Sequence, residues 1–422
     1  FPERPCSEDE ALDGVWQLLR EAAAKGVAGA RRPGMFLSGG LDSPLMALAV
    51  LDALPGDQDL PGFTFVPSRE WDRVETAGIY GDDRPLVEAL AQMHPRIRPQ
   101  FFSNEEIWFD HRLRDLFLAI GEAPASLTTY HMYHALWQGA REAGCDRLVC
   151  ADFGNFSYSQ AGGWAAAEYL RRGQWRQLLK ALDGGPADPR SLVRRFAVKA
   201  VLPNLPSALR TGLRRLAKGA QPGPREQVSA AAPALHALHA RQLAHSGTAR
   251  SFDGFVPRDR DEGHAHWIAI GDGGSGDIRQ GFEQLYGLRQ RDMAAYRPLV
   301  EFCLSLPTER FNSDGVGRRL ARRLGEGRVP EAIRRNTRSG LHGVDWHAKL
   351  GRRRLELAER LEHLRGDAAL AEAIDFDRLA AALRDWPEQS NYDLAVMGSR
   401  LVGVSQAVLN AEFVRFVEGR NT

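Results

Sequence analysis

The stretch that decides the fold is "MFLSGGLDSPLMALAV", residues 35–50. A short apolar run, predicted to be a buried strand, leads into Gly39 and Gly40. Residues 43–54 are predicted to form a helix with Ser43 as its N-cap and Pro44 in its first turn. A glycine turn between a strand and a helix points backbone N–H groups at the helix N-terminus, where the helix dipole favours an anion. The segment therefore predicts a phosphate-binding loop.

The polar side chains of this loop fit a phosphate that is bound together with a metal ion. The hydroxyl groups of Ser38 and Ser43 can hydrogen-bond phosphate oxygens, whereas the Asp42 carboxylate has the same sign of charge as a phosphate. Hard cations such as Mg²⁺ recruit carboxylates together with phosphates. We therefore expect Mg²⁺ between Asp42 and the phosphates.

Strands and helices alternate through the first part of the chain. Further strands are predicted at 60–66, 97–103 and 146–154, with helices at 82–94 and 128–145 between them, whereas 282–307 has helical patterning. This order predicts an α/β fold: a parallel sheet with helices on both faces, a large α-helical insertion and a helical C-terminal region. The expected divisions are an N-terminal helix in 1–30, the α/β core in 31–164, a basic helical insertion in 165–260, the rest of the domain in 261–345 and C-terminal helices in 346–422.

The composition is typical of a soluble globular protein. The 422 residues carry a net charge of +1, and the sequence shows no uninterrupted apolar run of the roughly 18 residues that a membrane-spanning helix needs, so we expect no membrane partner. The four cysteines are scattered, which favours buried free thiols in a reducing cytoplasm over a zinc site. The basic insertion could hold an acidic peptide, a protein or a nucleic acid. It lacks the interleaved aromatics of single-strand binders, so a solvated helical face is favoured and no nucleic-acid partner is expected.

The loop has the pattern S-G-G-x-D-S, and no lysine follows the glycines as it would in a Walker loop. The pattern resembles the pyrophosphate loop (PP-loop) of ATP pyrophosphatases, which cleave ATP between its α and β phosphates. By itself it also fits tRNA-modifying enzymes, NAD synthetase and asparagine synthetase. From residue 8 to about residue 345 the chain resembles the synthetase half of the asparagine synthetase family, including β-lactam synthetases and lasso-peptide cyclases. The resemblance implies an adenine nucleotide alpha hydrolase-like fold, with ATP and Mg²⁺ as cofactors.

The resemblance also implies two loops that hold the nucleotide. The first loop is implied to bind the nucleotide through Ser38, Gly39, Gly40, Leu41, Asp42 and Ser43. The second follows a strand in "ADFGNFSYSQAGG" and supplies Gly154 and Asn155. Asn155 stands where the family has an aspartate that serves Mg²⁺, so Asp152 is expected to supply the lost charge and to share the metal with Asp42.

Two further residues are implied to be catalytic. Glu122 corresponds to an acidic residue that assists proton transfer; Tyr130 and Tyr133 are alternative bases, and an ordinary surface position is the alternative reading of Glu122. Arg338 stands where the family has a lysine that faces the α-phosphate, and Gly340 and Leu341 follow it. A solvated basic loop is the alternative reading of Arg338.

These features predict a ligase that activates a carboxylate as an acyl-adenylate and transfers it to an amine. Because Asn155 and Arg338 depart from the asparagine-forming pattern, we expect a peptide or specialised small-molecule substrate, as in lasso-type cyclases. The alternatives are asparagine formation from aspartate and ammonia, a tRNA-modifying PP-loop enzyme and a non-catalytic binding protein. The chain starts at Phe1 without a glutaminase domain, so a separate glutaminase domain or a precursor peptide is an expected partner.

Overall fold

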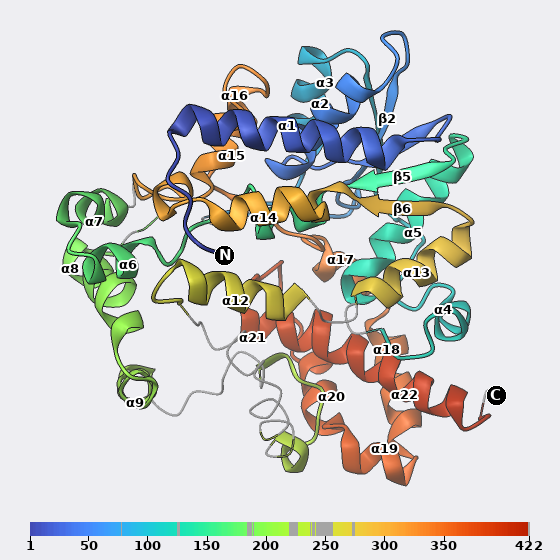
Figure 1. The fold of residues 1–422 in the computed structure, drawn as a ribbon. Helices are drawn as coiled ribbons and strands as arrows, with labels where there is room; N and C mark the ends of the chain where they lie inside the picture. The colour runs from blue at the N-terminus through green and yellow to red at the C-terminus, as the bar shows by residue number, and fades with distance from the viewer. Residues whose placement is uncertain are drawn as a thin grey trace.

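The computed structural model describes residues 1–76, 78–124, 127–183, 188, 190–218, 227–236, 238, 241, 256–271 and 275–420. Its centre is a five-stranded sheet in the order β4-β2-β1-β5-β6, in which every neighbouring pair is parallel. Figure 1 shows this sheet surrounded by helices. The predicted α/β fold is confirmed. The strands are β1 (Pro33–Phe36), β2 (Leu60–Phe65), β4 (Ile97–Phe102), β5 (Arg147–Cys150) and β6 (Arg289–Asp292).

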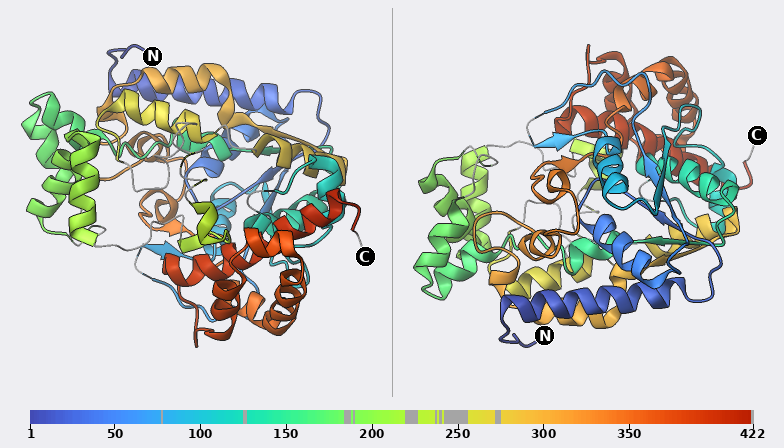
Figure 2. Two further views of the ribbon diagram at one scale, coloured as in Figure 1. Left: turned by 90° about the horizontal axis from the view of Figure 1, so that it is seen from below. Right: turned by 90° about the horizontal axis from the view of Figure 1, so that it is seen from above.

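Helices cover both faces of the sheet, as the two views of Figure 2 show. On one face the core includes side chains of α1 (Glu8–Val27), α2 (Asp42–Ala53), α3 (Arg84–Met93), α14 (Arg297–Ser305) and α15 (Arg319–Leu324). On the other face it includes side chains of α4 (Leu113–Ile120), α5 (Leu127–Glu142), α13 (Ser275–Tyr286) and the C-terminal helices. The inner strands β1 and β5 are almost entirely buried, as expected for parallel strands covered on both sides.

The expected helical patterning of residues 282–307 holds only in part, because the fifth strand β6 lies between α13 and α14. Its sequence, Arg-Gln-Arg-Asp, has no apolar residue, and only the Gln290 side chain is buried. β6 is an edge strand, and charged residues are common on edges because they discourage pairing with other chains. A four-residue polar strand gives no hydrophobic pattern from which it could be predicted.

The expected cap of α2 is also wrong. The helix begins at Asp42, with Leu41 at the N-cap position and no side-chain cap. Ser43 lies inside the first turn, and its hydroxyl group bonds the preceding loop instead of capping the helix. The first turn is therefore free of a side-chain cap and faces the candidate site described below.

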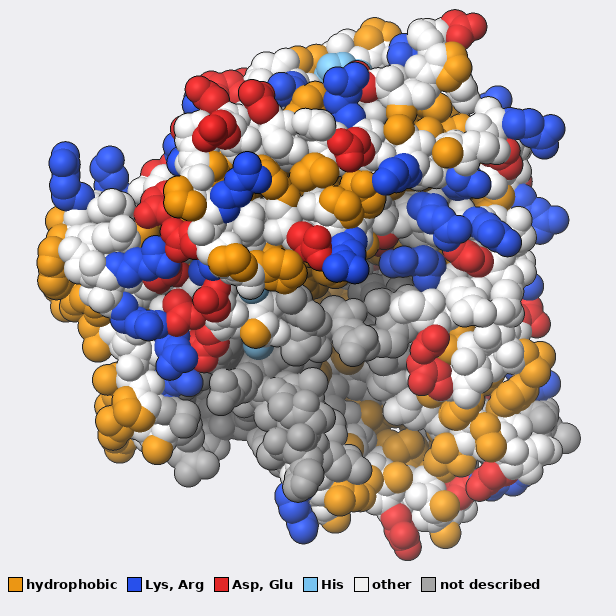
Figure 3. Space-filling view, in the orientation of Figure 1, with side chains coloured by type: hydrophobic (Ala, Val, Ile, Leu, Met, Phe, Trp, Pro, Cys, Tyr) orange, Lys and Arg blue, Asp and Glu red, His pale blue; other side chains and the backbone are white. Residues whose placement is uncertain are grey.

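The helical insertion extends from one side of the molecule (Figure 2). It comprises α6 (Ala165–Arg171), α7 (Trp175–Leu182), α8 (Leu192–Arg195) and α9 (Ser207–Lys218), and it has a small core of its own around Tyr169 and Leu178. The chain returns through α12 (Arg260–Gly271). Figure 3 shows acidic as well as basic side chains on this side of the molecule, with hydrophobic side chains along its outer edge.

The C-terminal region is largely helical, with a break at residues 385–393. It contains α17 (Trp346–Arg352), α18 (Arg354–Arg365), α19 (Ala368–Ala373), α20 (Phe376–Arg384), α21 (Leu394–Met397) and α22 (Ser405–Val417). The continuous helix Leu394–Val417 is long and apolar enough to cross a membrane by length and composition alone. In this structure, 61% of its most apolar 18-residue stretch is buried inside the fold, as in the core helix of a C-terminal helical region.

Candidate active site at the carboxyl edge of the sheet

The site lies where the strand order changes direction. β1 is flanked by β2 on one side and by β5 on the other, and all three strands are parallel. The chain therefore leaves the carboxyl ends of β1 and β5 toward different sides, and we call the region between the two connections the crevice. Ligands of open α/β sheets bind at such a switch point. The two predicted nucleotide loops, residues 37–43 and 151–157, are these two connections.

The first loop is held by the two serines. The Ser38 N–H donates to Ser43 Oγ at 2.9 Å, and the two hydroxyl oxygens are 3.0 Å apart. Gly39 permits close packing, because a Cβ there would lie 2.7 Å from Asp83 Oδ1. The Leu41 side chain is buried in the core, so Leu41 can offer a ligand only its backbone. The loop thus presents backbone N–H groups and hydroxyl groups at the N-terminus of α2.

The second loop packs directly against Asp42. A Cβ at Gly154 would lie 2.4 Å from Asp42 Oδ1, so only a glycine fits at this position without movement. Tyr158, which follows the loop, donates its hydroxyl group to the Asp42 backbone carbonyl at 2.9 Å. The structure therefore brings together the first loop and Gly154, which the sequence placed in one site.

The floor of the crevice is rich in carboxylates. Asp42 Oδ1 is buried and has no hydrogen-bond partner among the described residues. Burial raises the pKa of Asp42, and the nearby charge of Asp152 raises it further. The pKa of Asp152 is itself raised, chiefly because protein surrounds it, although its side chain stays accessible from the crevice. Asp42 Oδ1 still has no partner among the described residues and Asp152 is accessible, so the donor set of these two carboxylates fits the expected Mg²⁺.

A third carboxylate, Asp292, was missed by the sequence analysis because the strand that ends at it was missed. Its oxygens accept the Phe153 N–H at 2.9 Å and the Ala294 N–H at 3.1 Å. Burial, followed by repulsion from Asp152, raises the pKa of Asp292 to about 7. Ligand atoms of Cys150, Asp152 and Asp292 lie within 4.8 Å of one another. The Cys150 sulfur accepts a hydrogen bond from Gln290.

The Asn155 side chain is bonded to an arginine. Its side-chain oxygen accepts a hydrogen bond from Arg318, and the same guanidinium nitrogen lies 3.4 Å from Asp42 Oδ2. Arg318 precedes α15 and was also missed. It is one of four arginines in "GRRLARR", and nothing in the local sequence distinguishes it from the others.

Arg338 lies beside the crevice rather than on its floor. It bonds the Glu75 carboxylate, donates from Nε to the Ile79 carbonyl at 3.1 Å, and lies 5.9 Å from the centroid of the Tyr80 ring. The next residues form β7 (Ser339–Gly340), which pairs in parallel with β3 (Ile79–Tyr80). Arg338 is thus fixed by the short second sheet.

The same second sheet connects to the first loop. Tyr80 interacts with Asp83, the residue against which Gly39 packs. Burial raises the pKa of Asp83, while the charge of His342 lowers the pKa values of both Asp83 and Asp152. His342, which follows β7, therefore influences both of these carboxylates. Sequence reasoning assigned it no role, because nothing local marks it.

The structure does not connect Glu122 with these loops. Glu122 is exposed in the turn after α4, and within the described part of the chain it makes no hydrogen bond or ion pair. The Tyr130 side chain lies outside what the structure describes. Tyr133 is half-buried, and its ring centroid lies 5.8 Å from that of Phe36, as expected for a packing residue.

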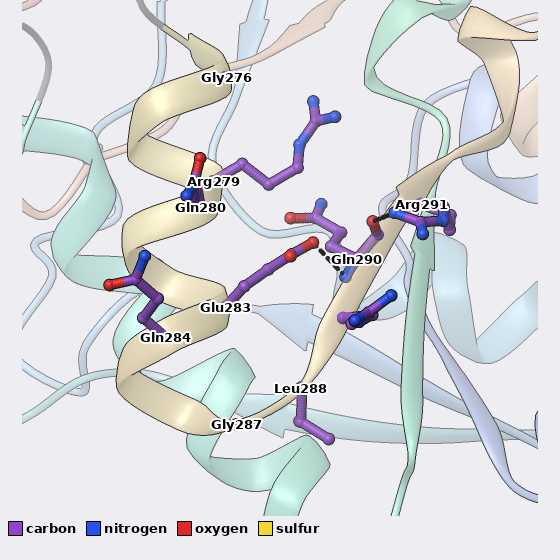
Figure 4. A pocket seen from close by; sticks show the side chains of 10 residues that line it. Gly276, Arg279, Gln280, Glu283, Gln284, Gly287, Leu288, Gln290 and Arg291 are labelled. Carbon is purple, nitrogen blue, oxygen red and sulfur yellow. Dashed lines mark hydrogen bonds between the residues drawn. The ribbon is translucent and has the colours of Figure 1, made fainter. Parts of the chain in front are cut away.

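A groove of about 540 Å³ lies beside the site, between α13 and β6. Figure 4 shows Arg279 extending from α13 toward the carboxyl end of β6, while Glu283 accepts the Gln290 N–H at 2.8 Å. The charge of Arg279 lowers the pKa values of Asp152 and Asp292. The groove thus lies next to the floor of the crevice. Strand β5 separates it from the first loop.

Residues 295–407 match the family model described as asparagine synthase. This supports membership of the asparagine synthetase family. The match runs from α14 into α22 and includes Arg318, Arg338 and His342, whereas the first loop lies outside it. No curated protein matches the chain.

The match over residues 295–407 supports an ATP-dependent, amide-forming ligase in general terms. The predicted ATP requirement is consistent with the family.

Proposed function

We propose that the chain is a ligase that activates a carboxylate with ATP and joins it to an amine. The observation that carries this proposal is the contact between the two loops at Asp42. A helix N-terminus without a side-chain cap, a buried carboxylate oxygen without a partner among the described residues and a glycine-permitted second loop converge there. Helix N-termini bind phosphates, and a carboxylate beside a phosphate requires a metal ion.

In the first step, the substrate carboxylate attacks the α-phosphorus of ATP. The bond between that phosphorus and the α,β-bridging oxygen breaks, which gives an acyl-adenylate and pyrophosphate. The first loop would hold the departing pyrophosphate through its N–H groups and the hydroxyls of Ser38 and Ser43. Asp42 and Asp152 would hold Mg²⁺, which neutralises phosphate charge. Arg338 would stabilise charge on the α-phosphate from the rim.

In the second step, an amine attacks the acyl carbon and AMP leaves. The amine loses a proton as the amide forms. Glu122 stays a prediction for the acceptor of this proton, and it requires that the exposed turn after α4 approach the bound substrate. AMP is a far better leaving group than oxide, so the protein's contribution is mainly to position the reactants and to neutralise charge.

For the substrate we favour a carboxylate on a peptide or a specialised small molecule. Asn155 is engaged by Arg318, and Arg338 carries the fixed charge of a guanidinium, so both departures from the asparagine-forming pattern have structural partners here. Asparagine formation from aspartate and ammonia is the second candidate, and the description of the matching family favours it.

The experiment is a product analysis with ATP and candidate carboxylates: aspartate, small β-amino acids and short precursor peptides. We expect carboxylate-dependent formation of AMP and pyrophosphate. Asp42→Asn should abolish this activity, whereas Asp57→Asn, which changes an exposed carboxylate in the turn before β2, should retain it. Formation of ADP and phosphate, or an unchanged rate in Asp42→Asn, would contradict the proposal.

A further inference from the structure

The second-loop side of the crevice already contains a cation. One nitrogen of the Arg318 guanidinium contacts both Asp42 Oδ2, at 3.4 Å, and Asn155 Oδ1. Its side chain is 30% exposed, so part of the guanidinium remains open to the crevice. A guanidinium has five N–H donors, and the remaining ones suit phosphate oxygens.

The backbone holds Arg318 in an uncommon conformation. Its φ of 63° lies in the left-handed region, which an arginine adopts rarely. The preceding loop is close to the segment after the second nucleotide loop, since a Cβ at Gly317 would lie 3.0 Å from the Ala161 carbonyl. The following residue is fixed by a bond from the Arg319 N–H to the Phe311 carbonyl at 3.0 Å. Packing therefore maintains a strained conformation that directs this side chain into the crevice.

Residue 155 is an amide rather than a carboxylate. An amide oxygen is neutral, and this one is already bonded to a cation. A divalent ion at the same oxygen would meet the guanidinium at close range and be repelled by it. Asp42 Oδ1 is unpartnered among the described residues and Asp152 is accessible, so these two carboxylates are the donors that remain for a metal.

We propose that Arg318, held by Asn155, takes the place of a metal ion on the second-loop side of the crevice. Phosphates bind there through the guanidinium, and Asp42 and Asp152 hold the divalent ion. This inference rests on the proposed function, because it requires that the crevice bind the phosphates of a nucleotide. Its consequence is that phosphate binding depends only partly on a divalent metal.

The test measures binding of inorganic pyrophosphate to the full chain by calorimetry, with Mg²⁺ and with a chelator. The wild-type protein should bind in both conditions. Arg318→Asn should lose about 10- to 100-fold in affinity with the chelator, as expected for loss of charge-assisted hydrogen bonds. Asparagine tolerates positive φ, so this variant keeps the backbone. Arg319→Gln, which removes the neighbouring charge paired with Glu8 and Asp314, is the matched control and should bind as the wild type does.

A second variant restores the carboxylate. Combining Asn155→Asp with Arg318→Asn should recover binding with Mg²⁺ while leaving it weak with the chelator, because a metal then replaces the guanidinium. Binding of wild type only with Mg²⁺, or unchanged chelator binding in Arg318→Asn, would overturn the inference while leaving the ligase proposal intact. If the wild type bound neither pyrophosphate nor ATP in either condition, the proposed function itself would fail, and the inference with it.

Discussion

The contact between the two nucleotide loops is tested most directly by Gly154→Ala. A Cβ at this position would lie 2.4 Å from Asp42 Oδ1 and 2.8 Å from its Cβ and Cγ. Atoms in ordinary contact are about 3.5 Å apart, so the carboxylate and the loop must separate by about 1 Å. Asp42 has little freedom to move, because it starts α2 and its carbonyl accepts the Tyr158 hydroxyl.

Two effects follow from this separation. Overpacking of this kind costs about 1–3 kcal/mol of folding free energy. Displacement of a site group by about 1 Å can reduce catalysis about 100-fold. We therefore expect Gly154→Ala to unfold at lower urea concentration and to bind Mg-ATP more weakly than the wild type. Urea denaturation and calorimetric titration with Mg-ATP measure the two effects separately.

Gly163→Ala is the matched control. Gly163 lies in the turn before α6, and an added Cβ there meets no atom within 4 Å. Its φ is outside the left-handed region, as is that of Gly154, so alanine strains neither backbone. By restricting the unfolded chain, this control should raise stability by up to about 1 kcal/mol. If Gly154→Ala matched Gly163→Ala in stability and in nucleotide affinity, the second loop would not abut Asp42, and the site as described would be refuted.

Three other predictions concern the surroundings of the site. Glu122→Gln should change the free energy of unfolding by less than about 0.5 kcal/mol, because the side chain is exposed and bonds none of the residues that the structure describes. A loss of ligase activity without loss of stability would then assign Glu122 to catalysis. Lys349→Met should cost about 1–3 kcal/mol in urea denaturation, because it removes a buried ammonium that donates to the Asn104 carbonyl at 2.6 Å and whose charge lowers the pKa of the buried Asp345. Adding Asp345→Asn should recover part of this loss. Finally, the wild type should lose stability relative to Asp292→Asn as the pH rises from about 4 to about 7 in urea denaturation.

The sign of the last prediction follows from proton uptake. The folded protein keeps the Asp292 proton up to a pKa of about 7, whereas the unfolded chain releases it near pH 4. Between these values the folded state binds more protons, so rising pH favours unfolding. A stability difference that stayed constant with pH would contradict the raised pKa. Additive effects of the two substitutions at Lys349 and Asp345 would contradict their coupling.

Much of the sheet could be predicted from the sequence because its inner strands are apolar and its connections carry turn signals. The helix starting at the first loop and the strands β1, β2, β4 and β5 were expected close to their observed positions. The edge strand β6 was not, because its pairing with β5 comes from tertiary contacts rather than from its own residues. The insertion and domain boundaries stay predictions.

The residues of the site also fall into those that the sequence could predict and those that it could not. Ser38, Gly39, Asp42 and Gly154 could be placed together because the carboxyl ends of parallel strands share one edge. Arg318 could not, because it reaches the crevice from a loop 276 residues beyond Asp42, and no spacing rule connects the two. Their roles in chemistry stay predictions, and the variants above test them.

The charges of the crevice explain why it would bind a nucleotide together with a metal, rather than either alone. The floor has the carboxylates of Asp42, Asp152 and Asp292, and Asp42 Oδ1 has no partner in the described structure, so the floor can accept a further cation. The rim has Arg318 and Arg338. Arg318 pairs with Asp42 and Arg338 pairs with Glu75, and both arginine side chains remain partly accessible. A phosphate alone would meet the floor carboxylates, and a metal alone would meet the rim arginines. A metal–phosphate complex brings a cation to the floor and anions to the rim, so it satisfies both at once.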